Sequence, residues 1–169
     1  MTYKCKQCGG EHFDFPALTF NSPYHYHTLS AEDKAELAEL TNDFCMIHHA
    51  QQTDRFIRVV LYQKIIDSCE NLSYGVWVSL SEKSYNDYKK NFENESHTVT
   101  YFGYLCNQIP PYDNTLSIKT TVYTQEGDAR PEIRVHAGEY DNHEFAKDFF
   151  DGITQQEALK RVEAMMEQL

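Results

Sequence analysis

The chain has 169 residues, of which 41% are apolar, 24% are charged and 23 are aromatic (12 Tyr, 10 Phe and 1 Trp). This composition excludes a disordered chain, and the length predicts a single domain spanning residues 1–169. The net charge of −11 argues against nucleic acid or a membrane surface as partner. The N-terminus MTYKCKQCGG lacks the apolar core of a secretion signal, so we expect a cytoplasmic protein with reduced cysteines.

The first half of the chain predicts a helix followed by two strands. Ser30, with Asp33 three residues later, is typical of a helix start, and small apolar residues extend this helix to about Leu40. Residues 43–47 around Cys45 predict a short buried strand. Residues 56–61 alternate with strand periodicity, and both faces of that strand are at least partly covered. The segment Gly75-Val-Trp-Val-Ser-Leu predicts another strand, with Trp77 facing away from its apolar neighbours.

The second half adds two helices and a hairpin. Ser81 caps a helix that carries Tyr85, Tyr88 and Phe92. Residues 116–122 and 133–135 form a predicted hairpin with a turn at Gly127. Thr154 opens a C-terminal helix, residues 154–169, whose predicted apolar stripe consists of Leu159, Val162, Met166 and Leu169. Together these elements predict an α+β fold: a mainly antiparallel sheet flanked by helices.

A cysteine pair near the N-terminus is the clearest sign of chemistry. Cys5 and Cys8 are followed by Gly9, which lets the backbone turn back so that two thiolates converge on a metal. A thioredoxin-like redox motif would need a helix after Cys8, and Gly9, Gly10 and Pro16 disfavour one. Residues 1–16 therefore predict a zinc-knuckle-like segment that supplies half of a metal site.

Several residues could complete that site. The candidates are thiolates and imidazoles, which zinc prefers: His12, the His25 and His27 pair, Cys45, and the His48-His49 pair. Each also has an ordinary structural interpretation. Cys45 fits a buried packing residue, and His25 and His27 fit a solvated loop after Pro23. The spacing alone leaves these alternatives open.

Other candidate chemistry is weaker. Glu132, Arg134 and His136 share one face of a predicted strand and could bind an anion, although any half-exposed strand shows such alternation. The chain contains no nucleophile elbow, phosphate-binding loop, dinucleotide fingerprint or zincin motif. No catalytic residue is therefore assigned.

The order of the motifs nevertheless resembles a known bacterial family. The segments that carry the resemblance are Cys5-x-x-Cys8-Gly9-x-x-His12, Asp43-Phe44-Cys45, Gly75-Val-Trp-Val-Ser-Leu-Ser81 and Phe102-Gly103. Together they are similar to domain of unknown function family 2199 (DUF2199), from Tyr3 to about Ile153. The resemblance implies a joint Cys₃His site made of Cys5, Cys8, His12 and Cys45, with Cys69 and Cys106 left as packing residues. The chain departs from the family pattern near His143.

Two classes of function follow from these observations. One is a non-enzymatic protein-interaction domain stabilised by zinc, immunity-like or regulatory, whose acidic surface meets a basic protein partner. The alternative is a metal-dependent hydrolase in which a Cys/His-bound metal keeps an open position for water. Sensing of a small ligand is a third possibility.

Overall fold

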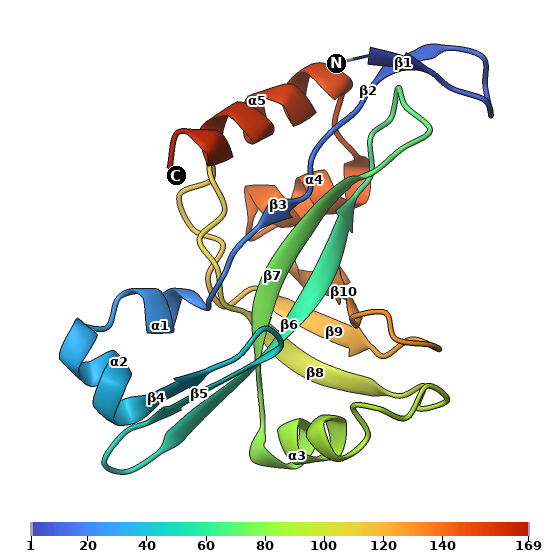
Figure 1. Cartoon of the computed structure of the whole chain (residues 1–169). Coiled ribbons are helices and arrows are strands. Elements are labelled where there is room, and N and C mark those ends of the chain that lie inside the picture. The colour runs from blue at the N-terminus through green and yellow to red at the C-terminus, as the bar shows by residue number, and fades with distance from the viewer. Residues whose placement is uncertain (1, 169) are drawn as a thin grey trace.

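The computed structural model describes residues 2–168 and shows an α+β fold with a mainly antiparallel sheet (Figure 1). The strands are β1 Thr2–Lys4, β2 Glu11–Phe13, β3 Leu18–Thr19, β4 Ala38–Leu40, β5 Phe44–His48, β6 Thr53–Gln63, β7 Leu72–Leu80, β8 Thr100–Leu105, β9 Lys119–Tyr123 and β10 Glu132–Val135. The helices are α1 Tyr24–His27, α2 Ala31–Leu37, α3 Glu82–Lys90, the 3₁₀ turn η1 Ala137–Glu139, α4 Glu144–Asp151 and α5 Gln155–Met166. The fold class predicted from the sequence is thus confirmed.

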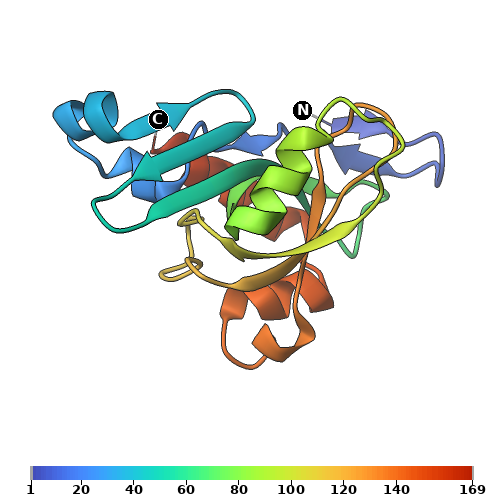
Figure 2. The same ribbon diagram turned by 90° about the horizontal axis from the view of Figure 1, so that it is seen from below.

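A barrel-like sheet forms the centre of the molecule. Strands β6 and β7 pair antiparallel from Arg55 opposite Leu80 to Gln63 opposite Leu72, which is the longest ladder of the sheet. The sheet continues from β7 through β8 and β9 to β10, and β10 then pairs in parallel with β6 through Glu132 and Val60. Strands β5 and β4 extend from β6 to one side of the barrel, while α4 lies on another side (Figure 2).

Side-chain alternation along these strands builds two apolar cores. The main core fills the barrel interior, where Ile57, Val59 and Val78 have no exposed surface. A second core lies on the outer face of β5, β6 and β7 and is covered by residues of the 20–38 segment. Its members are Cys45, Ile47, Phe56, Trp77 and Cys106. Trp77 faces away from Val76 and Val78, as the sequence pattern predicts, and its indole N–H donates to the carbonyl of Phe20 at 3.0 Å.

The three predicted helix starts are confirmed by their capping bonds. The hydroxyl oxygens of Ser30, Ser81 and Thr154 each accept a hydrogen bond, at 3.1 Å, from the backbone N–H three residues later. Each bond satisfies one of the amide groups that the first helical turn leaves without a partner. Local sequence chemistry therefore sets where these helices begin.

Two predicted boundaries and part of one predicted helix face are wrong. The helix after Ser30 ends at Leu37, because residues 38–40 pair with β5 instead of continuing the helix. The hairpin strand expected from residue 116 begins at Lys119, since Ser117 has a positive φ of 68°. In α5 the buried face consists of Ala158, Arg161 and Met165, whereas Met166 is 60% exposed. Val162 of the predicted stripe is partly buried and packs against the main core. Leu169, the last member of the predicted stripe, lies outside the described residues.

A polar cluster holds the C-terminal helices against the barrel. Arg161 of α5 is buried, and its guanidinium lies 3.0 Å from the carboxylate of Asp148 on α4. The Tyr112 hydroxyl also donates to Asp148, at 2.5 Å, and contacts the same guanidinium. The cluster thereby connects α4, α5 and the loop before β9. None of the helices described in residues 2–168 has both the length and the apolar character needed to cross a bilayer.

Candidate metal centre

The cysteine pair lies in the tight turn of the β1–β2 hairpin. The Cys5 carbonyl accepts from the Gly9 amide at 2.9 Å, and the Cys5 amide donates to the Gly10 carbonyl at 2.8 Å. Gly9 closes this turn at a φ of +72°, which residues with a side chain rarely adopt. The turn also directs backbone amides at both sulfurs: Gln7 N–H lies 3.4 Å from Cys5 Sγ, and Gly10 N–H lies 3.4 Å from Cys8 Sγ. Amides in these positions stabilise thiolates, the form of cysteine that binds metals.

The hairpin ladder brings His12 to the same point. His12 lies on β2 opposite Tyr3 of β1, and the Tyr3 ring packs edge-on against the imidazole with 6.2 Å between ring centroids. The imidazole is buried, and its Nε2 lies 3.1 Å from Cys8 Sγ. Strand pairing and ring packing thus direct a nitrogen ligand towards the cysteine turn.

The fourth ligand, Cys69, comes from a distant part of the sequence. It lies in the loop that joins β6 to β7, and this loop meets the hairpin at one end of the molecule (Figure 1). Gln155, the first residue of α5, connects the two segments. Its side chain accepts from the Phe13 amide at 3.0 Å and donates to the Asp67 carbonyl at 2.7 Å, and its backbone N–H donates to the Asp67 carboxylate at 2.8 Å. The start of α5 therefore fixes the position of the Cys69 loop beside the hairpin.

The ligand atoms of Cys5, Cys8, His12 and Cys69 all lie within 4.8 Å of one another. In a tetrahedral zinc site with Zn–S bonds of about 2.3 Å, two sulfurs are separated by about 3.8 Å, so this cluster needs only a small contraction to close on an ion. Three thiolates at this spacing repel one another unless a cation lies between them. The four residues can therefore hold a metal ion.

The thiol pKa values follow from the same contacts. The hydrogen bonds that Cys5 accepts from the Cys8 and Gln7 amides lower its pKa. Hydrogen bonding to Cys8 and then to Cys5 is the largest cause that raises the pKa of Cys69 to about 12. Cys5 thus ionises before Cys69, and its negative charge makes it harder for Cys69 to lose a proton.

The structure brings together Cys5, Cys8 and His12, as the sequence analysis expects, but it places Cys45 elsewhere. Cys45 is 1% exposed in the second core, paired across strands with Phe56, and burial raises its pKa to about 12. Cys69, expected to be a packing residue, is exposed and lies in the ligand cluster. No local motif marks Cys69, and only the pairing of β6 with β7 reveals its position.

The remaining candidates have other contacts. His25 stacks on Phe56 with 5.7 Å between ring centroids, and His27 ends the short helix α1. His48 lies 3.0 Å from the carboxylate of Glu39, and His49 lies 2.9 Å from that of Asp54. Among the predicted anion-binding residues, Arg134 lies 3.6 Å from Glu132, while His136 is hydrogen-bonded to the hydroxyl of Thr121 at 2.8 Å.

Comparison with protein families identifies the group to which this fold and cluster belong. The family model described as "Uncharacterized protein conserved in bacteria (DUF2199)" matches residues 4–153. The chain belongs to this family. The match contains all four clustered residues of the DUF2199 chain, whereas α5 with its connecting residue Gln155 lies beyond it. Searches of curated proteins and of solved structures gave no match.

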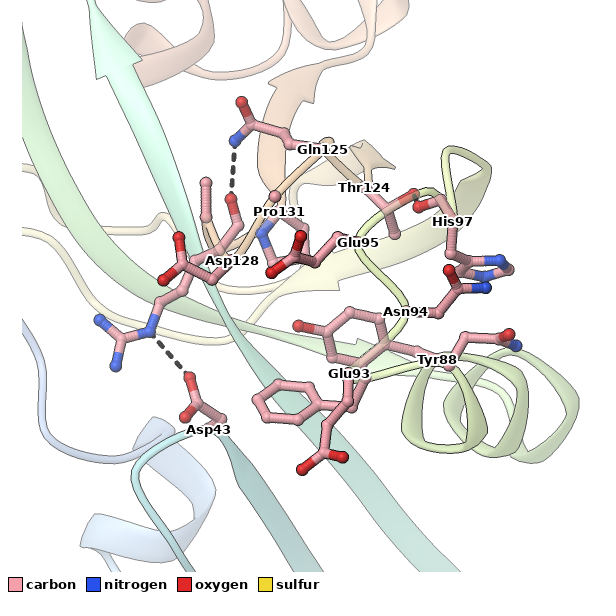
Figure 3. Close-up of a pocket in the computed structure, with 15 residues that line it drawn as sticks. Asp43, Tyr88, Glu93, Asn94, Glu95, His97, Thr124, Gln125, Asp128 and Pro131 are labelled. Carbon is pink, nitrogen blue, oxygen red and sulfur yellow. Dashed lines mark hydrogen bonds and ion pairs between the residues drawn. The ribbon is translucent and has the colours of Figure 1, made fainter.

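An acidic cavity of about 490 Å³ lies away from the metal cluster, beside the end of α3 (Figure 3). Carboxylates and two aromatic rings contribute to its lining: Asp43, Glu93, Glu95, Asp128, Tyr88 and Phe92. Its one arginine, Arg130, donates to the Asp43 carboxylate at 2.8 Å. This lining concentrates part of the negative charge of the DUF2199 chain on one face.

Proposed function

We propose that this protein is a cytoplasmic, zinc-stabilised protein-interaction domain. The observation that carries the proposal is the convergence of Cys5, Cys8, His12 and Cys69, because four protein ligands fill a tetrahedral zinc site and leave no position for substrate. A closed site of this kind stabilises structure instead of catalysing a reaction. In a reducing compartment the thiols remain available to bind the ion.

The donor set favours zinc over the hard cations. Thiolate and imidazole suit zinc, whereas calcium and magnesium require oxygen ligands. A catalytic zinc site normally has three protein ligands and a bound water. The composition of this cluster therefore favours a structural role over the alternative of a metal-dependent hydrolase.

The charge of the chain supports a protein partner. The net charge of −11 and the carboxylates around the cavity of Figure 3 create a negative potential that attracts a basic surface and accelerates its association. Small acidic proteins that neutralise toxins act in this way, and the present chain resembles them in size and charge. The partner we propose is a protein with a basic binding surface.

Metal analysis of three purified proteins tests the zinc site. Wild type prepared without chelator should contain one zinc per chain, and Cys69→Ser should lose most of it. Cys45→Ser is the matched control, because it alters a buried cysteine outside the cluster and should keep the metal. Metal-free wild type, or loss of zinc from Cys45→Ser alone, would refute the proposed ligand set. A bound water replacing one protein ligand in a crystal structure would support the hydrolase instead.

Affinity capture from the native host tests the partner. A basic protein should be recovered in near-stoichiometric amount and should be released by salt, because screening weakens attraction between charged surfaces. Glu93→Gln with Glu95→Gln should reduce recovery more than Glu32→Gln with Glu36→Gln, which removes the same charge from α2. Failure to recover a partner, or release that does not depend on salt, would contradict the proposal.

A further inference from the structure

The acidic cavity of Figure 3 lies between two turns of the backbone. One turn, residues 91–97, follows α3, and the other, residues 124–131, joins β9 to β10. The Gly127 amide of the second turn donates to the Glu95 carbonyl of the first at 2.9 Å. The walls of the cavity are therefore connected to each other through the backbone.

The cavity retains negative charge that no neighbouring cation neutralises. Asp43 is paired with Arg130 at 2.8 Å. Glu95 and Asp128 also line the cavity, and neither has an ion pair or a side-chain hydrogen bond in the described part of the chain. Figure 3 shows the Glu95 carboxylate extending into the cavity, whereas Glu93 points away from it.

Tyr88 of α3 adds a buried polar group that has no partner. It is 7% exposed, and its ring packs edge-on against Phe92 and Tyr101, with 5.7 and 6.3 Å between ring centroids. Its hydroxyl makes no hydrogen bond to any described residue. Unlike the Tyr74 oxygen, which is enclosed, the Tyr88 oxygen opens onto the cavity and points into it (Figure 3). Buried hydroxyl groups normally have a hydrogen-bond partner, so a ligand in the cavity would satisfy this one.

The spacing of the carboxylates does not suit a metal ion. Calcium and magnesium require several oxygens at about 2.0–2.6 Å from one ion. Within residues 2–168, the Cys/His cluster is the one group of three or more potential ligands whose atoms lie within 4.8 Å of one another. The carboxylates of the cavity are farther apart, and such a distribution of charge suits an extended cation that carries several positive groups.

We propose that this cavity binds a linear aliphatic polyamine. One ammonium group donates to the Tyr88 hydroxyl oxygen and to Glu95, and another is attracted by Asp128. The methylene chain between them packs on the ring of Phe92, which is 44% exposed, and an ammonium group near the ring gains cation–π attraction. The volume of about 490 Å³ accommodates a small molecule of this kind.

A guanidinium ligand fits the cavity less well. A planar guanidinium binds best when one carboxylate accepts two parallel hydrogen bonds from it. The carboxylate of Asp43 already accepts from Arg130, which lies at the edge of the same cavity. Separate ammonium groups on a flexible chain match the remaining acceptors.

Titration calorimetry with spermidine tests the binding, and two smaller dications of equal charge, 1,4-diaminobutane and Mg²⁺, serve as comparison. The diamine should bind about tenfold more tightly than Mg²⁺, because only the organic dication contacts the rings as well as the carboxylates. Spermidine should bind more tightly than either. Equal affinity for the diamine and Mg²⁺ would show that binding is general charge attraction and would overturn the proposal.

A tyrosine variant separates the site from the overall charge of the chain. Tyr88→Phe removes the hydroxyl, leaves the net charge at −11 and should weaken spermidine binding about fivefold or more. Tyr85→Phe is the matched control, because Tyr85 is buried on the same helix and does not line the cavity. The melting temperature of ligand-free Tyr88→Phe should not fall, since its hydroxyl has no partner. Unaltered affinity in Tyr88→Phe, or an equal loss in Tyr85→Phe, would refute the assignment.

A carboxylate variant provides a second, independent measurement. Glu95→Gln should weaken spermidine binding more than Glu36→Gln, which removes the same charge from an exposed position on α2. Equal losses would place the binding outside the cavity. The experiment uses the purified protein alone, so it is separate from capture of the basic partner. Spermidine binding without a captured partner would support this inference alone, and a captured partner without spermidine binding would support only the proposed function.

Discussion

The N-terminal hairpin and the barrel are stabilised by different means. The barrel surrounds a continuous apolar core in which Ile57, Val59 and Val78 are fully buried. The β1–β2 hairpin has two strands of three residues each, and His12 is the one buried residue among those described in these strands. An isolated two-stranded hairpin is marginal in water. The hairpin is therefore held by Gln155 and, as we propose, by a metal ion in its ligand cluster, whereas the barrel is held by burial of apolar surface.

This contrast implies that metal binding and barrel stability are separable. A structural metal site contributes folding energy directly, which is why small metal-bound segments unfold when the ion is removed. Burial contributes in proportion to the apolar surface removed from water. A change at one region should thus leave the other largely intact.

Removing the metal should have the largest effect. In Cys5→Ser with Cys8→Ser, or after treatment with a chelator, amides of the hairpin and of the 64–71 loop should lose nearly all protection from hydrogen exchange. Strands β6 and β7 should stay protected, because the barrel core does not depend on the cluster. Mass spectrometry of the exchanged protein measures protection in the hairpin, in the 64–71 loop and in strands β6 and β7. Equal loss of protection in hairpin and barrel would show that the two regions unfold together.

Core truncation should produce the opposite pattern. Ile57→Ala should lower the free energy of unfolding by about 2–5 kcal/mol, because it leaves a cavity at a fully buried position. Zinc content should remain that of wild type. Denaturant titration measures the free energy of unfolding, and metal analysis of the same sample measures the zinc content. Ile66→Ala is the control, because Ile66 is exposed. Loss of zinc from folded Ile57→Ala would contradict the separation.

Loosening the connection between the regions should have a moderate effect. Gln155→Ala removes the side-chain bonds to Phe13 and Asp67 and should cost about 1–3 kcal/mol in local opening. The metal should stay bound in Gln155→Ala, but its rate of transfer to a competing chelator should be about tenfold or more higher than in wild type. Its exposed neighbour Gln156→Ala is the control. Equal release rates in the two variants would show that Gln155 does not support the cluster.

Alkaline pH should have an effect that is small for each pH unit and accumulates only above pH 9. Burial raises the pKa of Cys45 to about 12 from a value near 9. Between these values the native state keeps a proton that the unfolded chain loses, so this group's contribution is complete below pH 9 and declines as pH rises towards 12. Cys45→Ala should therefore lose less stability per pH unit than wild type, by up to about 1.4 kcal/mol. Denaturant titrations from pH 8 to 11 give the free energy of unfolding of both proteins. Equal slopes against pH for wild type and Cys45→Ala would contradict this expectation.

Features set by local chemistry could be predicted from the sequence. Ser30, Ser81 and Thr154 begin helices as expected, because capping involves residues only three apart. The strands around Val59 and Val78 follow from side-chain alternation. Cys5, Cys8 and His12 are close in sequence, so one short hairpin brings them together.

Features that depend on long-range pairing could not be predicted. The closure of the barrel rests on a parallel contact between Glu132 and Val60, which no sequence pattern indicates. The helix expected to reach Leu40 is shorter because strand pairing with β5 overrides helix propensity there. Cys69 reaches the cluster only because the β6–β7 hairpin and the start of α5 place its loop beside the N-terminus.

The connection made by Gln155 also bears on the order in which the protein is completed during synthesis. The cysteine turn and His12 leave the ribosome first, the fourth ligand follows only when Cys69 is made, and the residue that fixes both segments comes almost last. Domains assemble from the N-terminus as synthesis proceeds. All four proposed ligands are therefore present in a nascent chain before the barrel strands β8 to β10 exist, but the bonds that fix the Cys69 loop beside the hairpin form only when α5 is made.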